Sequence, residues 1–424
     1  MDRKKLGNLN REKFGVILPI TLLSYFLILM DNSIIFTSSV QIGESLGLSA
    51  SALSWVSSAY TLTFGGFLLL SGRLSDLLGR KRIFLICLLI FGFSSLMIGL
   101  SKTAEMVIIM RAVQGIGSSI IAPTTLALIM DAYQNNMRQR AISYYGATAG
   151  IGSSIGLLVG GGLTSLISWR AGFLINVPFT LVLFILTLKY VKSSARRKET
   201  IDYLGSLLSI IGLVGIIFIF LFILWERKTS SPILPLTLFQ NKTRSGAYAT
   251  RLLFMMAMLP FWFFLPQMMQ SQYGFSALES GFAFLPLTIV NFIIAMQLPK
   301  LTGKFGNNRI LLIGEIILAI GLILLAISNP VNGYWQTVFV PMIILGLGQG
   351  LILAPVTSAG VYEAPDKLAG IASGVTNTMH QIGGPIGLSL IVAITTNFQT
   401  EIWIMTVFTL ISIVVVAIFL NTEK

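Results

Sequence analysis

Two charged residues lie inside stretches that are otherwise apolar enough to cross a membrane. Asp31 lies in the run 14–36, and Arg111 lies in the run 105–130. A carboxylate within the hydrocarbon core of a bilayer is costly, and such residues mark proton and substrate pathways by default. Removal from water disfavours the ionised carboxylate, so Asp31 could take up and release protons near neutral pH. It could also attract a cationic substrate, or lie at the outer membrane surface as an interfacial residue.

Arg111 begins the sequence R-A-V-Q-G-I-G, whose glycines permit close helix approach. A buried guanidinium needs an acceptor, which Asp31 or backbone carbonyls could supply. We expect Arg111 to act in proton coupling, and a purely structural polar tie is the alternative. Glu315, about six residues into the run 309–328, is a further coupling candidate, unless it reaches the cytoplasmic interface and pairs with a base there.

A short polar stretch between two apolar runs, Gly72 to Arg82, has the pattern G-x-L-x-D-x-x-G-R-K-R. We expect Asp76 to lie just past one helix and ahead of the next, where it can accept hydrogen bonds from free N–H groups and pair with an arginine. Gly72, Asp76, Gly79 and Arg80 are the predicted conformational latch. An ordinary charged loop is the alternative.

The run 141–163 is rich in glycine. Gly152, Gly156 and Gly160 recur every four residues and put a smooth groove on one helix face, with Gly161 beside it. Such a groove lets a second helix pack closely and slide or rock. Generic packing of small residues is the alternative.

Polar and aromatic residues of the second half could line a substrate cavity: Trp262, Gln349, Asn377, His380 and Gln381. His380 could equally be a hydrogen-bonded polar group or a proton relay. The Phe- and Met-rich run 252–270 could bind apolar cations, or it could face lipid.

Composition bounds the class of protein. The chain has 424 residues, 54% hydrophobic and 11% charged, whereas soluble domains carry about a quarter charged residues. One cysteine, Cys87, gives no disulfide framework, and one histidine removes most zinc chemistry. There is no nucleotide loop, metal cluster or nucleophile–base pair, so we expect neither an enzyme nor a metal or cofactor.

The apolar runs predict an all-α, polytopic membrane protein. Six runs lie at 14–36, 50–70, 83–100, 105–130, 141–163 and 171–190, and six more at 252–270, 277–298, 309–328, 336–359, 368–396 and 402–420. This layout predicts two six-helix bundles around a central cavity. The expected domains are an N-terminal bundle (1–191), a basic linker with an extra apolar segment (192–251) and a C-terminal bundle (252–424).

The basic residues predict the topology. With both termini in the cytoplasm, all of the 29 lysines and arginines except Lys102, Arg111 and Arg170 fall on the cytoplasmic side. The net charge of +13 therefore reflects membrane orientation rather than nucleic-acid binding. If the run 203–225 crossed the membrane once, the lysines and arginines after it would move to the outer side. The run is also too short to cross twice. We expect an in-plane or re-entrant helix, or a truncated hairpin.

These motifs together resemble the fourteen-spanner drug:proton antiporter branch of the major facilitator superfamily. The stretch 72–82 resembles the loop between helices 2 and 3, and Gly152 to Gly161 resembles the antiporter signature G-x-x-x-G-P-x-x-G-G, with Leu157 in place of proline. Further likeness lies in W-R-x-x-F-x-I-N-V-P from 169, in G-x-G-Q-G from 346 and in the glycines from 370 to 387. His380 stands where the group often carries arginine, and the central hairpin is shortened to 203–225.

The resemblance implies a multi-pass cell-membrane exporter that moves drugs or toxic amphiphiles outward as protons enter, with Asp31 as the membrane-embedded carboxylate of the group. Substrate, protons and lipid would then be its partners, and we expect a monomer. Two alternatives stay open: a transport-inactive sensor of the same fold, favoured by the shortened centre, and a dedicated exporter of one metabolite, lipid or antibiotic.

Overall fold

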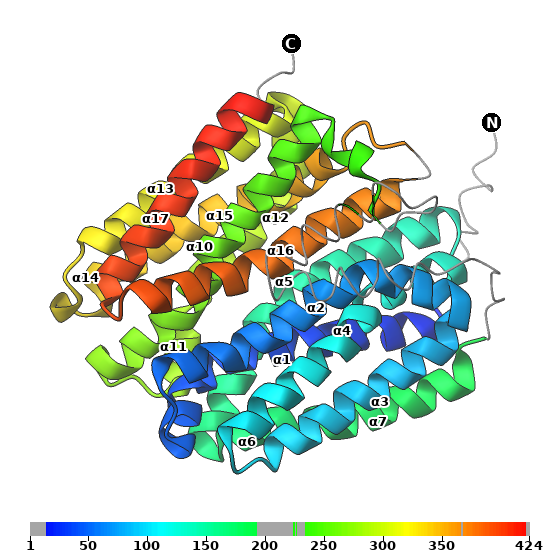
Figure 1. Cartoon of the computed structure of the whole chain (residues 1–424), viewed down its shortest axis with the longest axis horizontal. Coiled ribbons are helices and arrows are strands. Elements are labelled where there is room, and N and C mark those ends of the chain that lie inside the picture. The colour runs from blue at the N-terminus through cyan, green and yellow to red at the C-terminus, as the bar shows by residue number, and fades with distance from the viewer. Residues whose placement is uncertain (1–13, 193–223, 225, 227–233, 366–367, 421–424) are drawn as a thin grey trace, which may run out of the picture.

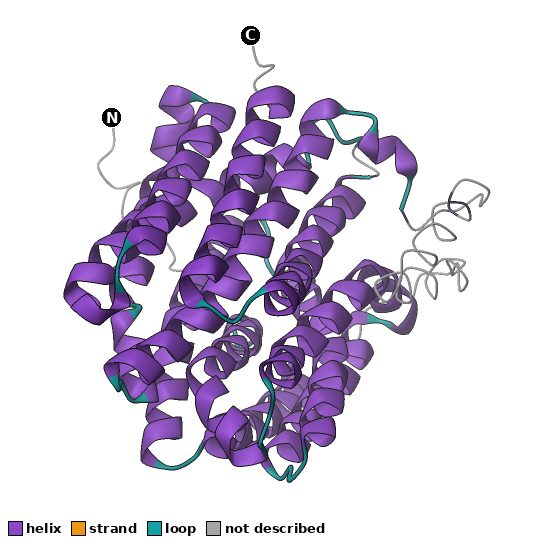
Figure 2. Cartoon of the chain, turned by 60° about the vertical axis from the view of Figure 1, so that its left-hand side comes forward, coloured by secondary structure: helices purple, strands orange, loops and turns teal. Residues whose placement is uncertain are grey.

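A computed structural model gives the fold of residues 14–192, 224, 226, 234–365 and 368–420. Every regular element in these residues is helical (Figure 2). The first half contains α1 (Ile17–Leu46), α2 (Ala50–Leu78), α3 (Arg80–Gly99), α4 (Ala104–Ala132), α5 (Asn135–Leu166), α6 (Trp169–Leu174) and α7 (Asn176–Tyr190). The second half contains η2 (Leu236–Phe239), α10 (Lys242–Tyr273), α11 (Ala277–Ala283), α12 (Leu285–Phe305), α13 (Asn307–Ile327), η3 (Pro330–Asn332), α14 (Tyr334–Thr337), α15 (Phe339–Gly360), α16 (Ala369–Ile394), α17 (Phe398–Val415) and η4 (Val416–Leu420).

All twelve predicted spans are confirmed as helical segments, and most extend several residues past the apolar runs. The largest differences are at α1, which ends at Leu46, ten residues after the expected end, and at α10, which begins at Lys242, ten residues before the expected start. The Asn241 side chain caps it by accepting a hydrogen bond from the Arg244 amide at 3.0 Å. Residues 203–223 of the predicted extra segment lie outside the described part of the chain, so its in-plane or re-entrant placement stays a prediction.

Proline positions explain why three spans are broken into two helices. Pro178 and Pro341 each stand four residues after the last residue of a short helix, α6 at Leu174 and α14 at Thr337. A proline has no N–H to donate to the carbonyl four residues earlier, which weakens the helix there. The helix breaks before these two prolines but continues through Pro260 and Pro266 of α10. Pro286 opens α12 after α11 in the same way.

One glycine makes each of two equivalent turns. Gly79 joins α2 to α3 and Gly306 joins α12 to α13, both with φ of 84°. A side chain is strained in this left-handed region, so glycine is needed at both positions. The turn between the second and third spans of the first half therefore recurs in the second half.

The two halves lie side by side in Figure 1, with α2 and α5 of the first half against the second half. Helix α2 packs against α16, and α5 packs against α11. Nine segments of the described chain are long and apolar enough to cross a membrane, and α2, α5 and α16 are not among them. These three helices carry many Gly, Ser and Thr residues, so small and weakly polar side chains form the boundary between the halves.

Hydrogen bonds join the halves at the far end, defined as the end where α1 finishes and α17 begins. Gln41 of α1 donates to the side-chain oxygen of Gln270 in α10 at 3.1 Å, and Gln270 donates to the Thr37 carbonyl at 3.2 Å. The Leu278 amide of α11 donates to the Ser165 hydroxyl at 3.1 Å. The bundle is therefore closed at this end.

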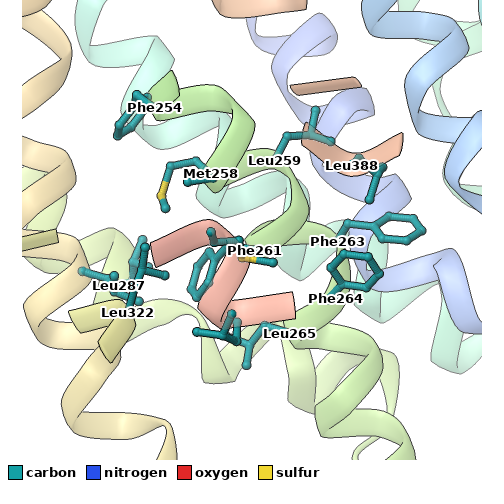
Figure 3. Packing of buried hydrophobic residues seen from close by; sticks show 14 of the residues in the cluster. Phe254, Met258, Leu259, Phe261, Phe263, Phe264, Leu265, Leu287, Leu322 and Leu388 are labelled. Carbon is teal, nitrogen blue, oxygen red and sulfur yellow. The ribbon is translucent and has the colours of Figure 1, made fainter. Parts of the chain in front are cut away.

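Helix α10 runs through the largest apolar core. Figure 3 shows its side chains packed against Leu287, Leu322 and Leu388 of three other helices. The buried residues of α10 include Phe254, Met258, Leu259, Phe261, Phe263, Phe264 and Leu265. The interpretation of this run as lipid-facing is therefore wrong for these side chains, which form the core.

Candidate functional site

Asp31 and Arg111 meet in a fully enclosed polar cluster inside the first half. Both side chains have 0% exposure, and Arg111 Nη1 lies 2.8 Å from Asp31 Oδ2. Two amides complete the carboxylate's contacts, because Asn176 Nδ2 and Gln114 Nε2 donate to Asp31 Oδ1 at 2.6 and 3.0 Å. The predicted pairing is confirmed. The interfacial placement of Asp31 is wrong, since the side chain has no exposed surface.

Arg111 has further partners on α2 and α4. Its Nε donates to the Val56 carbonyl at 3.2 Å, and its Nη1 donates to Gln114 Oε1 at 2.7 Å. The guanidinium lies 4.3 Å from the centre of the Tyr60 ring, which adds a cation–π contact. Its Nη2 has no hydrogen-bond partner among the described residues.

Glycine brings α4 close enough to α2 for these contacts. A Cβ at Gly115 would lie 2.3 Å from the Tyr60 carbonyl oxygen and 2.2 Å from Thr63 Oγ1. The Thr63 hydroxyl donates to the Ala112 carbonyl at 2.7 Å across the same contact. Arg111, one turn before Gly115, therefore reaches the backbone of α2, as the R-A-V-Q-G-I-G pattern predicted.

The cluster compensates the charge of Asp31. An ion pair with two added amide donors leaves the carboxylate no free charge to offer a ligand. The arrangement does not favour direct attraction of a cationic substrate by Asp31, and that role stays a prediction. Protonation of Asp31 would leave Arg111 as an unpaired buried cation, so this arrangement favours the ionised carboxylate, and the charges of the two residues depend on each other.

Sequence reasoning missed three members of this cluster. Gln114 and Asn176 contact the carboxylate, and the Ser95 hydroxyl accepts from Gln114 Nε2 at 2.8 Å and from Asn176 Nδ2 at 3.3 Å. The available signals were the spacing of Gln114, one helical turn after Arg111, and the amide of the I-N-V-P sequence. Ser95 lies in an apolar run that already contains several small polar residues, so nothing distinguishes it.

The predicted latch differs from the structure in one respect. Asp76 lies within the last turn of α2, which continues to Leu78, and α3 begins at Arg80 directly after the single-residue turn at Gly79. The placement of Asp76 between helices is therefore wrong, because one glycine suffices to reverse the chain. Gly72 also belongs to α2, and the Asp76 side chain lies outside the described part.

Arg80 does bind a carboxylate at this end of the bundle. Its guanidinium forms an ion pair with Asp131 at the end of α4, and it donates to the Ala127 carbonyl at 3.2 Å. The neighbouring Lys81 donates to the Leu188 carbonyl at 2.8 Å. The basic cluster thus ties α3 to α4 and α7, and a latch role for it stays a prediction.

The glycine groove of α5 is confirmed and it faces α1. Added Cβ atoms at Gly156 and Gly160 would lie 2.8 Å from the Met30 Cα and 2.7 Å from the Ile34 Cα. Gly152 lies against Leu29 in the same way, at 3.0 Å from its Cβ. The backbone that carries Asp31 is therefore seated directly on the groove.

Gly161 faces the other half of the molecule. A Cβ there would lie 2.5 Å from the Ala277 carbonyl oxygen in α11. Reciprocally, a Cβ at Gly281 would lie 2.8 Å from the Leu157 carbonyl oxygen. The antiporter-like glycines thus serve two contacts, with α1 inside the first half and with α11 across the boundary.

The predicted cavity residues do not form one group. Gln349 is buried, and its Nε2 is 3.2 Å from the sulfur of Met258, a weak acceptor. Trp262 stacks on Phe284 with 4.8 Å between ring centres, and Gln381 lies at the contact with Gly65 of α2. Asn377 is exposed in the middle of α16.

His380 lies near Arg251, a buried cation that the sequence reasoning did not identify as a candidate site residue. Arg251 of α10 is 7% exposed, and its charge is close enough to interact with His380 of α16 and Tyr25 of α1. Arg251 stands at the edge of an apolar run, after several basic residues, and the topology count assigned it to a cytoplasmic linker. The signal available was its apolar setting, between Ala-Thr and Leu-Leu-Phe.

Glu315 is a second fully buried carboxylate, on α13. It has 0% exposure, and no described base lies within ion-pair distance. Ser412 of α17 lies nearby without meeting hydrogen-bond geometry. The interpretation that Glu315 pairs with a base at the interface is therefore wrong, and its coupling role stays a prediction.

A surface hollow at the far end has a volume of 410 Å³. It is lined by Gln41, Glu44 and Trp169 among others, and none of the predicted cavity residues borders it. This hollow is therefore separate from the polar groups around Arg251.

Comparison with known protein families shows to which family the chain belongs. The family described as Major Facilitator Superfamily matches residues 21–388, which is most of the chain. This protein is a member of the major facilitator superfamily. It therefore has a multi-pass membrane transporter fold, and transporters of this superfamily are not enzymes.

Individual relatives are similar to the chain over most of its length. The chain is 30% identical over 396 residues to the uncharacterized MFS-type transporter EfpA of Mycobacterium tuberculosis, covering 87% of this chain and 74% of the relative. It is also 30% identical to multidrug resistance protein 3 of Bacillus subtilis, covering 90% and 79%, and to the puromycin resistance protein pur8 of Streptomyces alboniger, covering 90% and 81%.

Solved structures share the fold. The nucleoside transporter NupG superposes with a TM-score of 0.72 at 14% identity, covering 97% of this chain and 100% of that one. The xylose transporter XylE from E. coli gives the same score at 14% identity, covering 96% and 97%. At this identity the likeness concerns the fold alone.

Proposed function

We propose that this superfamily member is a proton-coupled exporter of drugs or toxic amphiphilic compounds, working by alternating access. The observation that carries the proposal is the enclosed Asp31–Arg111 pair, with a distance of 2.8 Å and 0% exposure of both side chains. A buried ion pair is stable while both partners are charged, and removing one charge leaves the other uncompensated. Proton uptake at Asp31 would therefore change the energy of the conformation that encloses it.

The relatives named for multidrug and puromycin resistance support the export direction and the class of substrate. Cytoplasmic termini, a plasma-membrane location and a monomeric state complete the proposal, supported by the distribution of basic residues. With that orientation the far end faces outward, so the described conformation is closed to the outside.

A continuous path of contacts would connect the proton site to the boundary between the halves. Asp31 lies on α1, α1 rests on the α5 glycine groove, and Gly161 at the end of that groove contacts α11. We propose that loss of the Asp31 charge shifts α1 on α5 and so changes the α5–α11 contact. Such a ligand-dependent shift needs only a difference in proton affinity between the two conformations.

The test of the proposal is efflux from cells that express the protein. We expect outward transport of at least one of two fluorescent amphiphiles, the cation ethidium and the anion pyrenebutyrate. A protonophore should reduce that efflux to the level of cells without the protein. The protein must be shown in the membrane by immunoblotting. Absence of protonophore-sensitive efflux of both probes would contradict the proposed activity and favour a binding role or a narrower substrate.

A further inference from the structure

Arg251 is a buried cation with few partners. Its side chain projects from α10 at 7% exposure, and Nη1 donates to the Leu353 carbonyl of α15 at 3.4 Å. That bond is longer than an ordinary N–H···O bond, which is about 2.9 Å. The Nε atom has no hydrogen-bond partner among the described residues.

Other buried or half-buried arginines in the described part of the chain have carboxylate or carbonyl partners. Arg111 has Asp31, Arg80 has Asp131, and Arg244 donates to the carbonyls of Leu238 and Tyr362 at 2.7 and 3.0 Å. No described carboxylate lies within ion-pair distance of Arg251. Burying a guanidinium without an anion or a full set of acceptors is unfavourable, so this site lacks a partner.

Further polar groups around Arg251 are also weakly bonded. His380 Nδ1 of α16 has no partner among the described residues. Gln349 has only the Met258 sulfur for its Nε2, and this contact lies two helical turns along α10 from Arg251. Helices α10 and α16 thus bring the unsatisfied polar atoms of Arg251 and His380 close enough to interact.

An aromatic surface lies opposite, in the first half. Tyr25 of α1 and Tyr145 of α5 stack with 4.1 Å between ring centres and 13° between ring planes, and both are half-buried. Tyr25 lies close enough to Arg251 to interact with its charge. The stacked Tyr25 and Tyr145 of one half therefore lie within electrostatic range of the Arg251 cation of the other.

We propose that Arg251, with His380, binds the carboxylate of an amphiphilic substrate whose apolar body lies against Tyr25 and Tyr145. A guanidinium offers two parallel donors that match a carboxylate, and Nε with one terminal nitrogen supplies such a pair. This assignment rests on the proposed export function and names the substrate class. It reverses the expectation of a cation site, because the negative charge of Asp31 is already compensated.

Binding of two matched probes to the purified protein in detergent tests this site without requiring transport. Pyrenebutyrate and its analogue pyrenebutyl-trimethylammonium share an apolar body and differ in charge, and both accept energy from tryptophan emission. We expect the wild-type protein to bind the carboxylate about tenfold more tightly, the factor for one charge-assisted hydrogen bond of about 1.4 kcal/mol. Arg251→Gln should remove this preference by weakening carboxylate binding alone.

Two further variants separate binding from folding. Lys242→Gln removes an exposed charge from the same helix and should keep the full preference. Arg251→Lys retains the buried charge and should keep part of the preference, which matters if Arg251→Gln does not fold. Equal or tighter wild-type binding of the ammonium probe, binding of neither probe, or equal weakening of both probes by Arg251→Gln would overturn the assignment.

The outcomes for this site and for export are distinguishable. Charge-selective binding without protonophore-sensitive efflux would retain the carboxylate site and refute the transport proposal. Protonophore-sensitive efflux of ethidium without charge-selective binding would retain the transport proposal and refute the carboxylate site.

Discussion

Asp31→Asn is expected to reduce protonophore-sensitive efflux to the level of cells that lack the protein. The amide cannot exchange a proton, yet it is nearly the same size and can still accept from Asn176 and Gln114. Coupling should therefore be lost through chemistry rather than shape. Efflux of whichever probe the wild-type protein exports is the measurement, normalised to the amount of protein in the membrane.

The same substitution leaves Arg111 without its counter-charge. Breaking a buried pair by removing one partner costs about 3–5 kcal/mol, so Asp31→Asn alone should also lower the melting temperature in detergent. The double variant Asp31→Asn/Arg111→Gln removes both charges and should recover much of that stability while remaining inactive. Recovery of stability together with activity would show that the carboxylate is a structural tie and carries no proton.

A matched control lies on the same helix. Glu44 is exposed near the end of α1, so Glu44→Gln makes the same chemical change without touching the enclosed pair. We expect Glu44→Gln to retain efflux within about twofold, because surface substitutions change stability by less than about 0.5 kcal/mol. Unchanged efflux from Asp31→Asn would refute its coupling role directly.

Gly161→Ala is expected to hold the far end open. The new Cβ would lie 2.5 Å from the Ala277 carbonyl oxygen and 2.9 Å from the Leu278 Cα, and both atoms belong to the backbone of α11. Overpacking of this kind costs about 1–3 kcal/mol. Because we expect this contact only in the conformation closed at the far end, the ratio of closed to open protein should fall by about 5- to 150-fold.

The adjacent glycine provides a sharp control. A Cβ at Gly162 would approach nothing nearer than the Leu278 Cδ1 at 3.8 Å, so Gly162→Ala should leave the equilibrium unchanged. Spin labels at Leu166 and Phe282, which are 80% and 51% exposed, report the separation of the halves in a Cys87→Ser background. Equal distance distributions for the two glycine variants would contradict the assignment of Gly161 to closure.

The sequence predicted the spans well because a run of about twenty apolar residues matches the length that a helix needs to cross a bilayer. Helix ends were less predictable, since polar side chains such as those of Lys242 and Arg244 continue a helix beyond the apolar run. The position of Asp76 was wrong for a related reason. A single glycine with positive φ can reverse the chain, so a polar stretch does not require a loop of equal length.

The enclosed Asp31–Arg111 cluster was partly predictable for electrostatic reasons. A carboxylate and a guanidinium inside two membrane spans each need a partner, which points to Asp31 with Arg111. Ser95 carries no such signal, because small polar residues occur throughout these helices. The predicted cavity residues were the least predictable. Trp262, Gln349 and Asn377 are all polar or aromatic residues of the second half, but they lie at different places in the fold.

Arg251 shows why charge counting alone can mislead. Its place at the border of an apolar run made it resemble the cytoplasmic lysines and arginines that set topology. Only the packing of α10 against α15 and α16 shows that its side chain is buried and lacks a counter-charge.

Proton movement in proteoliposomes tests the central claim, proton exchange at Asp31, most directly. Liposomes that contain the purified protein and the internal pH dye pyranine would receive an outward gradient of the exported probe. We predict that the wild-type protein moves protons against the probe flux, and that Asp31→Asn in the stability-matched double variant moves none. Probe-driven proton movement of equal size in that variant, or probe transport by the wild-type protein without proton movement, would contradict the account.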